Sequence, residues 1–145
     1  FWHLKLLLND SPGCHLEIGY DEDLAHLIYA GADLLVMPSL YEPCGLTQMI
    51  ALRYGTVPVV RAVGGLKDTV FDRDYSALPP QQRNGFVFEH ADPLGLESAL
   101  DRALGLWRNE PALFRQLVLQ GMACDYSWNH PGQRYLDLYE SIRHK

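Results

Sequence analysis

The chain has 145 residues, of which 48% are hydrophobic, so it is long and apolar enough for one folded domain and is not a disordered polymer. Its formal net charge of -6 argues against nucleic acid as a partner, and no apolar run reaches membrane-spanning length. The cysteines are three in number and lack the paired spacing of metal ligands, which favours free thiols in a reducing compartment.

Strand and helix patterns alternate along the first half of the chain. We predict a helix end at Trp2–Leu8, a strand at His15–Gly19, a helix from Asp21 to about Ala30, a strand at Asp33–Met37, a helix at Thr47–Tyr54 and a strand at Val57–Val60. Asp21 is expected to cap its helix, with acidic residues in the favoured first turn.

The second half begins with a break at Gly64-Gly65 and then becomes helical. We predict a short helix or turn at Leu66–Phe71, a polar surface loop at Asp72–Arg83, a last strand at Gly85–Phe88, and three helices that begin near Pro93, Pro111 and Pro131 and occupy about residues 92–145. Four strands alternating with helices predict an α/β fold, a Rossmann-like parallel sheet with helices on both faces.

Glu42 lies in a turn between the apolar run Leu34–Met37 and the helix that starts at Thr47. The carboxyl ends of parallel strands are where α/β sheets bind ligands. The free N–H groups of a helix start favour an anion such as a diphosphate. One short loop here can therefore hold both a sugar hydroxyl and a phosphate, although Glu42 taken alone is better explained as a carboxylate that stabilises the helix dipole.

The run from Glu42 to Gln48, Glu-Pro-Cys-Gly-Leu-Thr-Gln, resembles the signature of bacterial glycogen synthases and plant starch synthases. Segments that resemble the same family occur in the same order at Ile18–Glu22, Gly64–Val70, Asn84–Phe88 and Asp125–Trp128. The similarity extends from about His15 to the C-terminus.

The resemblance implies the C-terminal, nucleotide-sugar-binding lobe of a two-lobed GT-B glycosyltransferase. On this view residues 1–145 form one partial domain without the N-terminal acceptor lobe, and we expect the chain alone to be inactive. The complete enzyme would transfer glucose, with retention, from ADP-glucose to the non-reducing end of an α-1,4-glucan. The resemblance implies no cofactor, no metal, no nucleic acid and no membrane partner, and a location in the bacterial cytoplasm or the plastid stroma.

By the same resemblance, the catalytic residue is Glu42, which binds the donor glucose. The expected donor-binding residues are Tyr20, which stacks on adenine, and Cys44, Gly45, Leu46, Thr47, Gly64 and Gly65. For Cys44 we prefer the interpretation of a small buried hydrophobe over a nucleophile, because no histidine follows at a suitable spacing. Tyr20 as a rim aromatic and Gly64-Gly65 as a simple turn are the structural alternatives.

Two other functions stay open. One is a transferase for another sugar nucleotide, such as a UDP-glucose-using enzyme similar to sucrose synthase, against which the Glu42–Gln48 signature argues. The other is a non-catalytic module that binds glucan or a protein partner. Glucan-binding modules usually display aromatic pairs on β-sandwiches, and this sequence shows no such pattern.

Overall fold

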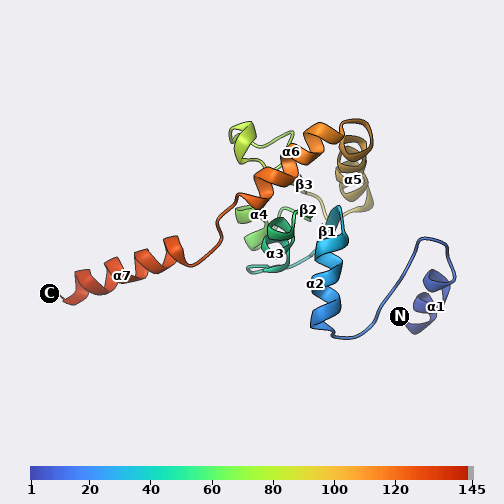
Figure 1. Cartoon of the computed structure of the whole chain (residues 1–145), viewed down its shortest axis with the longest axis horizontal. Helices are drawn as coiled ribbons and strands as arrows, with labels where there is room; N and C mark the ends of the chain where they lie inside the picture. The colour runs from blue at the N-terminus through green and yellow to red at the C-terminus, as the bar shows by residue number, and fades with distance from the viewer. Residues whose placement is uncertain (144–145) are drawn as a thin grey trace.

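The computed structural model describes residues 1–143. Its elements in chain order (Figure 1) are α1 (Trp2–Asn9), α2 (Glu22–Gly31), β1 (Leu34–Met37), α3 (Thr47–Tyr54), β2 (Val57–Arg61), α4 (Gly64–Thr69), a 3₁₀ turn η1 (Pro80–Gln82), β3 (Phe86–Phe88), α5 (Pro93–Asn109), α6 (Pro111–Met122) and α7 (Asn129–Arg143).

The three strands form one parallel sheet in the order β1-β2-β3. Leu34 is in register with Val57 across the first pair, and Val59 with Phe86 across the second. Parallel strands joined through helices confirm the predicted α/β fold. The carboxyl ends of all three strands lie at one edge, where the loops that follow them meet.

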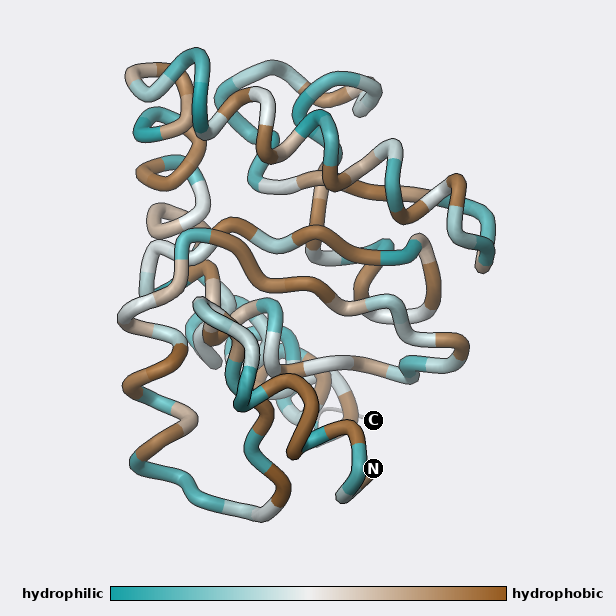
Figure 2. The backbone as a smooth tube through the Cα atoms, turned by 90° about the vertical axis from the view of Figure 1, so that its right-hand side faces the viewer, coloured by the Kyte–Doolittle hydropathy of each residue, from teal (hydrophilic) through white to brown (hydrophobic). Residues whose placement is uncertain are grey.

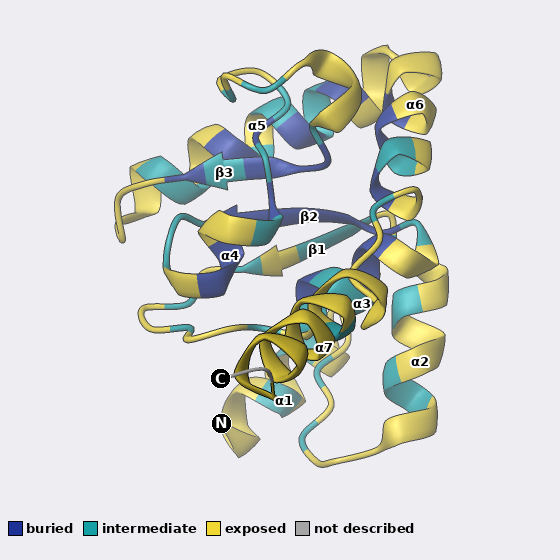
Figure 3. Ribbon diagram, turned by 90° about the vertical axis from the view of Figure 1, so that its left-hand side faces the viewer, coloured by how far each residue is buried: buried dark blue, intermediate teal, exposed yellow. Residues whose placement is uncertain are grey.

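Alternate residues of β2 supply the two faces of the core. Val57 and Val59 pack with β3 against buried residues of α5 and α6, including Ala103 and Phe114. Val60 faces the other way, into a smaller cluster with Leu66 of α4 and with Val70. Figure 3 shows the largely buried strands β2 and β3 with α5 on one side and α4 on the other, so helices cover both faces as predicted.

The predicted strand His15–Gly19 is wrong. The segment has no strand pairing in the part of the chain that the structure describes, where the sheet has three strands rather than four. Instead, the Leu16 N–H donates to Asn9 Oδ1 at 2.6 Å, and Asn9 Nδ2 donates to the Leu16 carbonyl at 3.4 Å. A local side chain therefore satisfies backbone groups that a neighbouring strand would otherwise have to pair.

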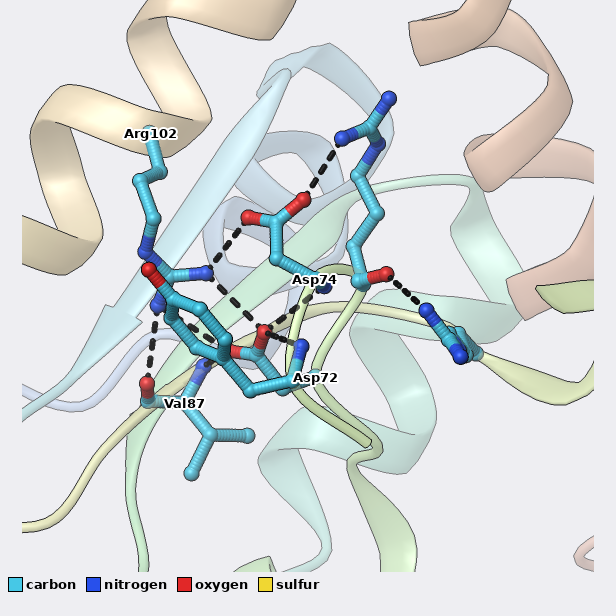
Figure 4. Close-up of polar contacts among 7 residues, drawn as sticks. Asp72, Asp74, Val87 and Arg102 are labelled. Atoms are coloured by element: carbon cyan, nitrogen blue, oxygen red, sulfur yellow. Dashed lines mark hydrogen bonds and ion pairs between the residues drawn. The ribbon is translucent and has the colours of Figure 1, made fainter. Parts of the chain in front are cut away.

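Asp72–Arg83 was predicted to be a surface loop, but its first residue is a buried aspartate. Asp72 is 7% exposed and accepts hydrogen bonds from the Val87 N–H at 2.6 Å and from two Arg102 guanidinium nitrogens at 3.0 Å each. Arg102 also bonds Asp74 at 2.7 Å (Figure 4). These hydrogen bonds attach the loop to β3 and α5. The polar residues of the loop had predicted only that it lies at the surface.

Helices α1 and α7 lie at opposite ends of the molecule (Figure 1), and neither has a buried residue. Trp2, at the start of α1, is 69% exposed, and Trp128, directly before α7, is 72% exposed. Hydrophobic stretches run along the central strands in Figure 2. Among residues 1–143, no helix combines the length and the apolar character needed to cross a bilayer.

Candidate functional site

Two loops meet at the carboxyl edge of the sheet. The loop Pro38–Leu46 leads from β1 to α3, and the short turn Ala62–Val63 leads from β2 to α4. Because β1 and β2 are parallel neighbours, these two connections lie side by side. This edge is the expected ligand position in an open α/β sheet.

The glycine pair Gly64-Gly65 lets helix α4 approach the Glu42 loop closely. The Gly65 N–H donates to the Glu42 carbonyl at 3.3 Å. A Cβ atom on Gly64 would overlap the carbonyl oxygen of Glu42, and one on Gly65 would overlap that of Cys44. Gly64 also has a φ of 47°, in the left-handed region. The helix therefore begins at Gly64, two residues earlier than predicted, because its first turn packs on the loop backbone.

Gly45 adopts a φ of 72°, which favours glycine, and then the chain enters α3. A Cβ atom on Gly45 would lie 2.5 Å from Oε1 of Gln48, so the side chain of Gln48 occupies that space. The N-cap residue Leu46 makes no side-chain capping bond. The first turn of α3 thus has amide N–H groups that no side chain caps, at the edge where an anion would bind.

The Glu42 carboxylate is half-buried, and Ser39 Oγ donates to its Oε2 at 3.4 Å. No salt bridge involves Glu42 within residues 1–143. The turn before it is held by Arg61 at the end of β2, whose Nε donates to the Ser39 carbonyl at 2.7 Å and whose Nη2 donates to the Leu40 carbonyl at 2.6 Å. Arg61 supports the Glu42 loop, and the sequence analysis did not identify it. Its position directly at the end of a predicted strand is the signal that could have indicated it.

The structure brings together seven of the eight predicted site residues, namely Glu42, Cys44, Gly45, Leu46, Thr47, Gly64 and Gly65. Tyr20 is different. It follows the unpaired segment before α2 and is 90% exposed, so its ring lies at the surface and its role stays a prediction.

The expectation of a buried Cys44 is wrong, because its side chain is exposed. The backbone of this residue makes the contacts. Its carbonyl oxygen faces Gly65 and accepts a hydrogen bond from Gln48 Nε2 at 3.3 Å. With the carbonyl facing the protein, the side chain is left outside.

A cleft of about 330 Å³ opens beside these loops, lined by residues that follow or end all three strands, including Pro38, Arg61 and Phe88. A larger cavity of about 1020 Å³ lies between α4 and the start of α7. Neither of these two cavities is lined by a predicted site residue, whereas Leu46 lines a third cavity of about 690 Å³ beside α3. The candidate site lies at the carboxyl edge of the sheet, where the smaller cleft adjoins Pro38 and Leu40 of the Glu42 loop. No cluster of metal-ligating side chains occurs in the described part of the chain.

The end of α4 is held in place from the side opposite to the loop. Tyr126 donates its hydroxyl hydrogen to the Thr69 carbonyl at 2.6 Å, and Asn84 Nδ2 donates to the same oxygen at 3.0 Å. Burial, reinforced by the neighbouring Cys124, raises the pKa of Tyr126 well above its usual range. The phenol therefore remains a donor throughout the ordinary pH range.

Comparison with known proteins now places the chain in a family. The model for glycosyl transferases group 1 matches residues 2–113. This chain belongs to the group 1 glycosyl transferases. The matched residues include the loops after β1 and β2.

Within the group 1 glycosyl transferases, similarity to glycogen and starch synthases is extensive, which confirms the resemblance. The chain is 64% identical to Glycogen synthase 1 of Nitrosococcus oceani over 99% of its length, and 66% identical to Glycogen synthase 1 of a Synechococcus species over 100%. It spans only 29% and 30% of those two curated relatives.

Solved structures agree with the predicted fold. The catalytic domain of starch synthase IV from Arabidopsis thaliana, bound to ADP and acarbose, matches 99% of this chain and 29% of its own, with a TM-score of 0.93 and 40% identity. Sucrose-phosphate synthase from Thermosynechococcus elongatus matches 99% of this chain and 34% of its own, with a TM-score of 0.69 and 26% identity. The lobe of a GT-B glycosyltransferase is thus the fold that the comparisons support.

Proposed function

We propose that these residues form the donor-binding part of a retaining glucosyltransferase, which transfers glucose from ADP-glucose to the non-reducing end of an α-1,4-glucan. The observation that carries the proposal is the packing of the Glu42 loop between the uncapped start of α3 and the Gly64-Gly65 turn. The glycogen synthase relatives support the reaction, and the ADP bound to the Arabidopsis enzyme supports an adenine nucleotide.

Each part of the loop has a separate role in this proposal. Glu42 accepts hydrogen bonds from donor glucose hydroxyls. Among residues 1–143 its carboxylate has one side-chain partner, Ser39 at 3.4 Å, which leaves acceptor capacity for these hydroxyls. The amide groups of Leu46 and Thr47 face the diphosphate and stabilise the charge that grows on it as the bond to glucose breaks. Fixed N–H groups do this without a metal ion, so the proposal requires neither metal nor cofactor.

The acceptor side is proposed to come from the remaining length of the enzyme. The chain spans about 30% of its curated relatives. Transfer requires that donor and glucan be held together and that water be excluded, which closure of two lobes achieves. We therefore propose that the 145 residues alone transfer no glucose.

For the complete enzyme we propose a location in the bacterial cytoplasm or the plastid stroma.

A chimeric enzyme tests the function directly. This chain replaces the matching 29% of the Nitrosococcus oceani protein, and incorporation of labelled glucose into glycogen is measured with ADP-glucose and with UDP-glucose. We expect incorporation from ADP-glucose by the chimera and none by the 145-residue chain. Preference for UDP-glucose would overturn the donor assignment. Binding of the isolated chain to amylose beads without nucleotide, together with an inactive chimera, would favour a non-catalytic glucan-binding module.

A further inference from the structure

Gln48 is a fully buried polar residue, at 0% exposure, in the first turn of α3. Its Nε2 donates to the Gly45 carbonyl at 2.8 Å and to Thr69 Oγ1 at 3.0 Å, with the Cys44 carbonyl at 3.3 Å. The signature of the sequence includes Gln48, but nothing in the pattern indicates what its side chain does.

The hydrogen bonds of Gln48 continue into a closed ring. Thr69 donates its hydroxyl hydrogen to the Gly65 carbonyl at 2.6 Å. Gly65 in turn donates its N–H to the Glu42 carbonyl at 3.3 Å. The ring therefore runs from the loop after β1, through Gln48 and Thr69 to the helix after β2, and returns to Glu42.

The donors and acceptors of this ring leave one workable chemistry at position 48. The carbonyls of Gly45 and Cys44 only accept, and Thr69 uses its one hydroxyl hydrogen on Gly65. A side chain that donates at least two hydrogens is thus required. The amide N–H₂ of Gln48 provides them, whereas the carboxylate of glutamate would place negative charge against acceptors.

The carboxamide oxygen of Gln48 indicates that these hydrogen bonds do not serve stability alone. Oε1 of Gln48 is buried and has no hydrogen-bond partner in the described part of the chain. A buried acceptor without a donor lowers stability. We infer that the Gln48 side chain maintains the geometry of the loop, because its hydrogen bonds hold the loop although its oxygen is left without a donor.

We propose that Gln48 and Thr69 are positioning residues, which set the Glu42 loop and the start of α3 relative to α4 so that both face the donor. The proposal rests on the proposed function for the identity of the donor. Neither residue is a catalytic residue. Gln48 is buried beneath the loop, and Thr69 acts through Gln48 and Gly65.

The test uses Thr69→Val and Gln48→Met in the chimeric enzyme, because both keep side-chain volume close to the original and remove the hydrogen bonds. Thr69→Ser keeps the hydroxyl and should restore activity. The matched control is Thr56→Val. The Thr56 hydroxyl is buried and shares its one hydrogen between two backbone carbonyls, those of Tyr29 at 2.6 Å and Ala32 at 3.0 Å, but it lies at the opposite end of β2.

We expect Thr69→Val and Gln48→Met each to lower kcat/KM at least tenfold, while Thr56→Val and Thr69→Ser stay within threefold of the unsubstituted chimera. The double variant should be little worse than either single variant, because both break the same ring. Each variant is compared with the unsubstituted chimera on whichever donor that chimera uses. A switch to UDP-glucose therefore overturns the donor assignment and leaves the positioning test intact.

Hydrogen exchange of the 145-residue chain gives a readout that needs no activity. The Gly65 amide, whose N–H donates to the Glu42 carbonyl, should exchange at least tenfold faster in Thr69→Val and Gln48→Met than in Thr56→Val. Equal exchange in all three variants would overturn the proposal. So would kcat/KM values within twofold of the unsubstituted chimera in variants that lose as much thermal stability as Thr56→Val, because the ring would then be structural only.

Discussion

The backbone carbonyl of Glu42 occupies the position that a Cβ atom of Gly64 would need. The loop that carries the proposed catalytic carboxylate and the first turn of α4 therefore meet in direct backbone contact. Gly65 makes the same kind of contact with Cys44. Side chains at 64 or 65 would move the loop away from α4, and with it the carboxylate.

Gly65→Ala should lower the activity of the chimeric enzyme at least a hundredfold, because the added methyl displaces the loop backbone and a misplacement of about 1 Å costs on the order of a hundredfold in rate. The measurement is kcat with saturating ADP-glucose. Gly105→Ala is the matched control, since a Cβ there meets nothing within 4 Å in the middle of α5. It should raise stability by about 0.5–1 kcal/mol and leave kcat unchanged. Equal activity in the two variants would contradict the packing argument.

Glu42→Gln should reduce kcat about a hundredfold or more, equivalent to roughly 2–4 kcal/mol of lost transition-state stabilisation, with little change in the unfolding temperature. Within the described residues the carboxylate has a single side-chain partner, Ser39 at 3.4 Å, so its removal disturbs few contacts. Ser39→Ala serves as the control and should lower kcat less than tenfold. A Glu42→Gln enzyme with most of its activity would remove Glu42 from the site.

Tyr20→Ala should weaken ADP binding to the chimeric enzyme by several-fold to tenfold, as expected for a lost aromatic stack of about 1 kcal/mol. Stability should not change, since Tyr20 is 90% exposed. Tyr20→Phe keeps the ring and should bind ADP as the unsubstituted enzyme does. Calorimetry that finds the same ADP affinity for the alanine and phenylalanine variants would show that the ring is only a surface aromatic.

Asp74 should make the fold sensitive to acid. Burial opposes its charge, but hydrogen bonds from Arg102 at 2.7 Å and Arg73 at 2.6 Å outweigh burial and hold the pKa of Asp74 below its usual value of 3.8. A carboxyl with a lowered pKa in the folded state stabilises the fold above about pH 4, and that contribution is lost as the pH falls through the folded pKa.

Thermal unfolding of the chain with Asp74→Asn measures this contribution. At pH 7 the variant should unfold at a lower temperature than the unsubstituted chain, and the difference should shrink steadily below pH 4. Asp101→Asn, at an exposed position on α5, is the control and should show little difference at either pH. A gap for Asp74→Asn that is the same at pH 3 and pH 7 would mean that its charge contributes nothing.

Elements with local signals could be predicted from the sequence. Asp21 caps its helix as expected, by accepting from the Leu24 N–H at 2.9 Å, and Asp92 caps α5 in the same way by accepting from the Gly95 N–H at 2.7 Å. The helix Thr47–Tyr54 has the predicted bounds and ends at Gly55, whose φ is 87°. Caps and left-handed ends depend on residues three or four positions apart, so the pattern contains what decides them.

Pairing and burial depend on distant residues, and there prediction failed. The segment His15–Gly19 was predicted to be a strand but has no paired neighbour among the described residues, and Asn9 bonds the Leu16 backbone instead. Asp72 stands in a polar stretch, but Arg102 on α5 makes its burial possible. A strand needs an adjacent edge and a buried charge needs a partner, and both are supplied only once the chain has folded.

The candidate site divides in the same way. That a carboxylate, a glycine and a helix start follow one apolar strand could be predicted, since these residues are neighbours in the chain. That Gly64-Gly65 packs on this loop, and that Gln48 joins the loop to Thr69 across 21 positions, depends on the folded chain. The parallel sheet places the ends of β1 and β2 side by side although a whole helix separates them in the sequence.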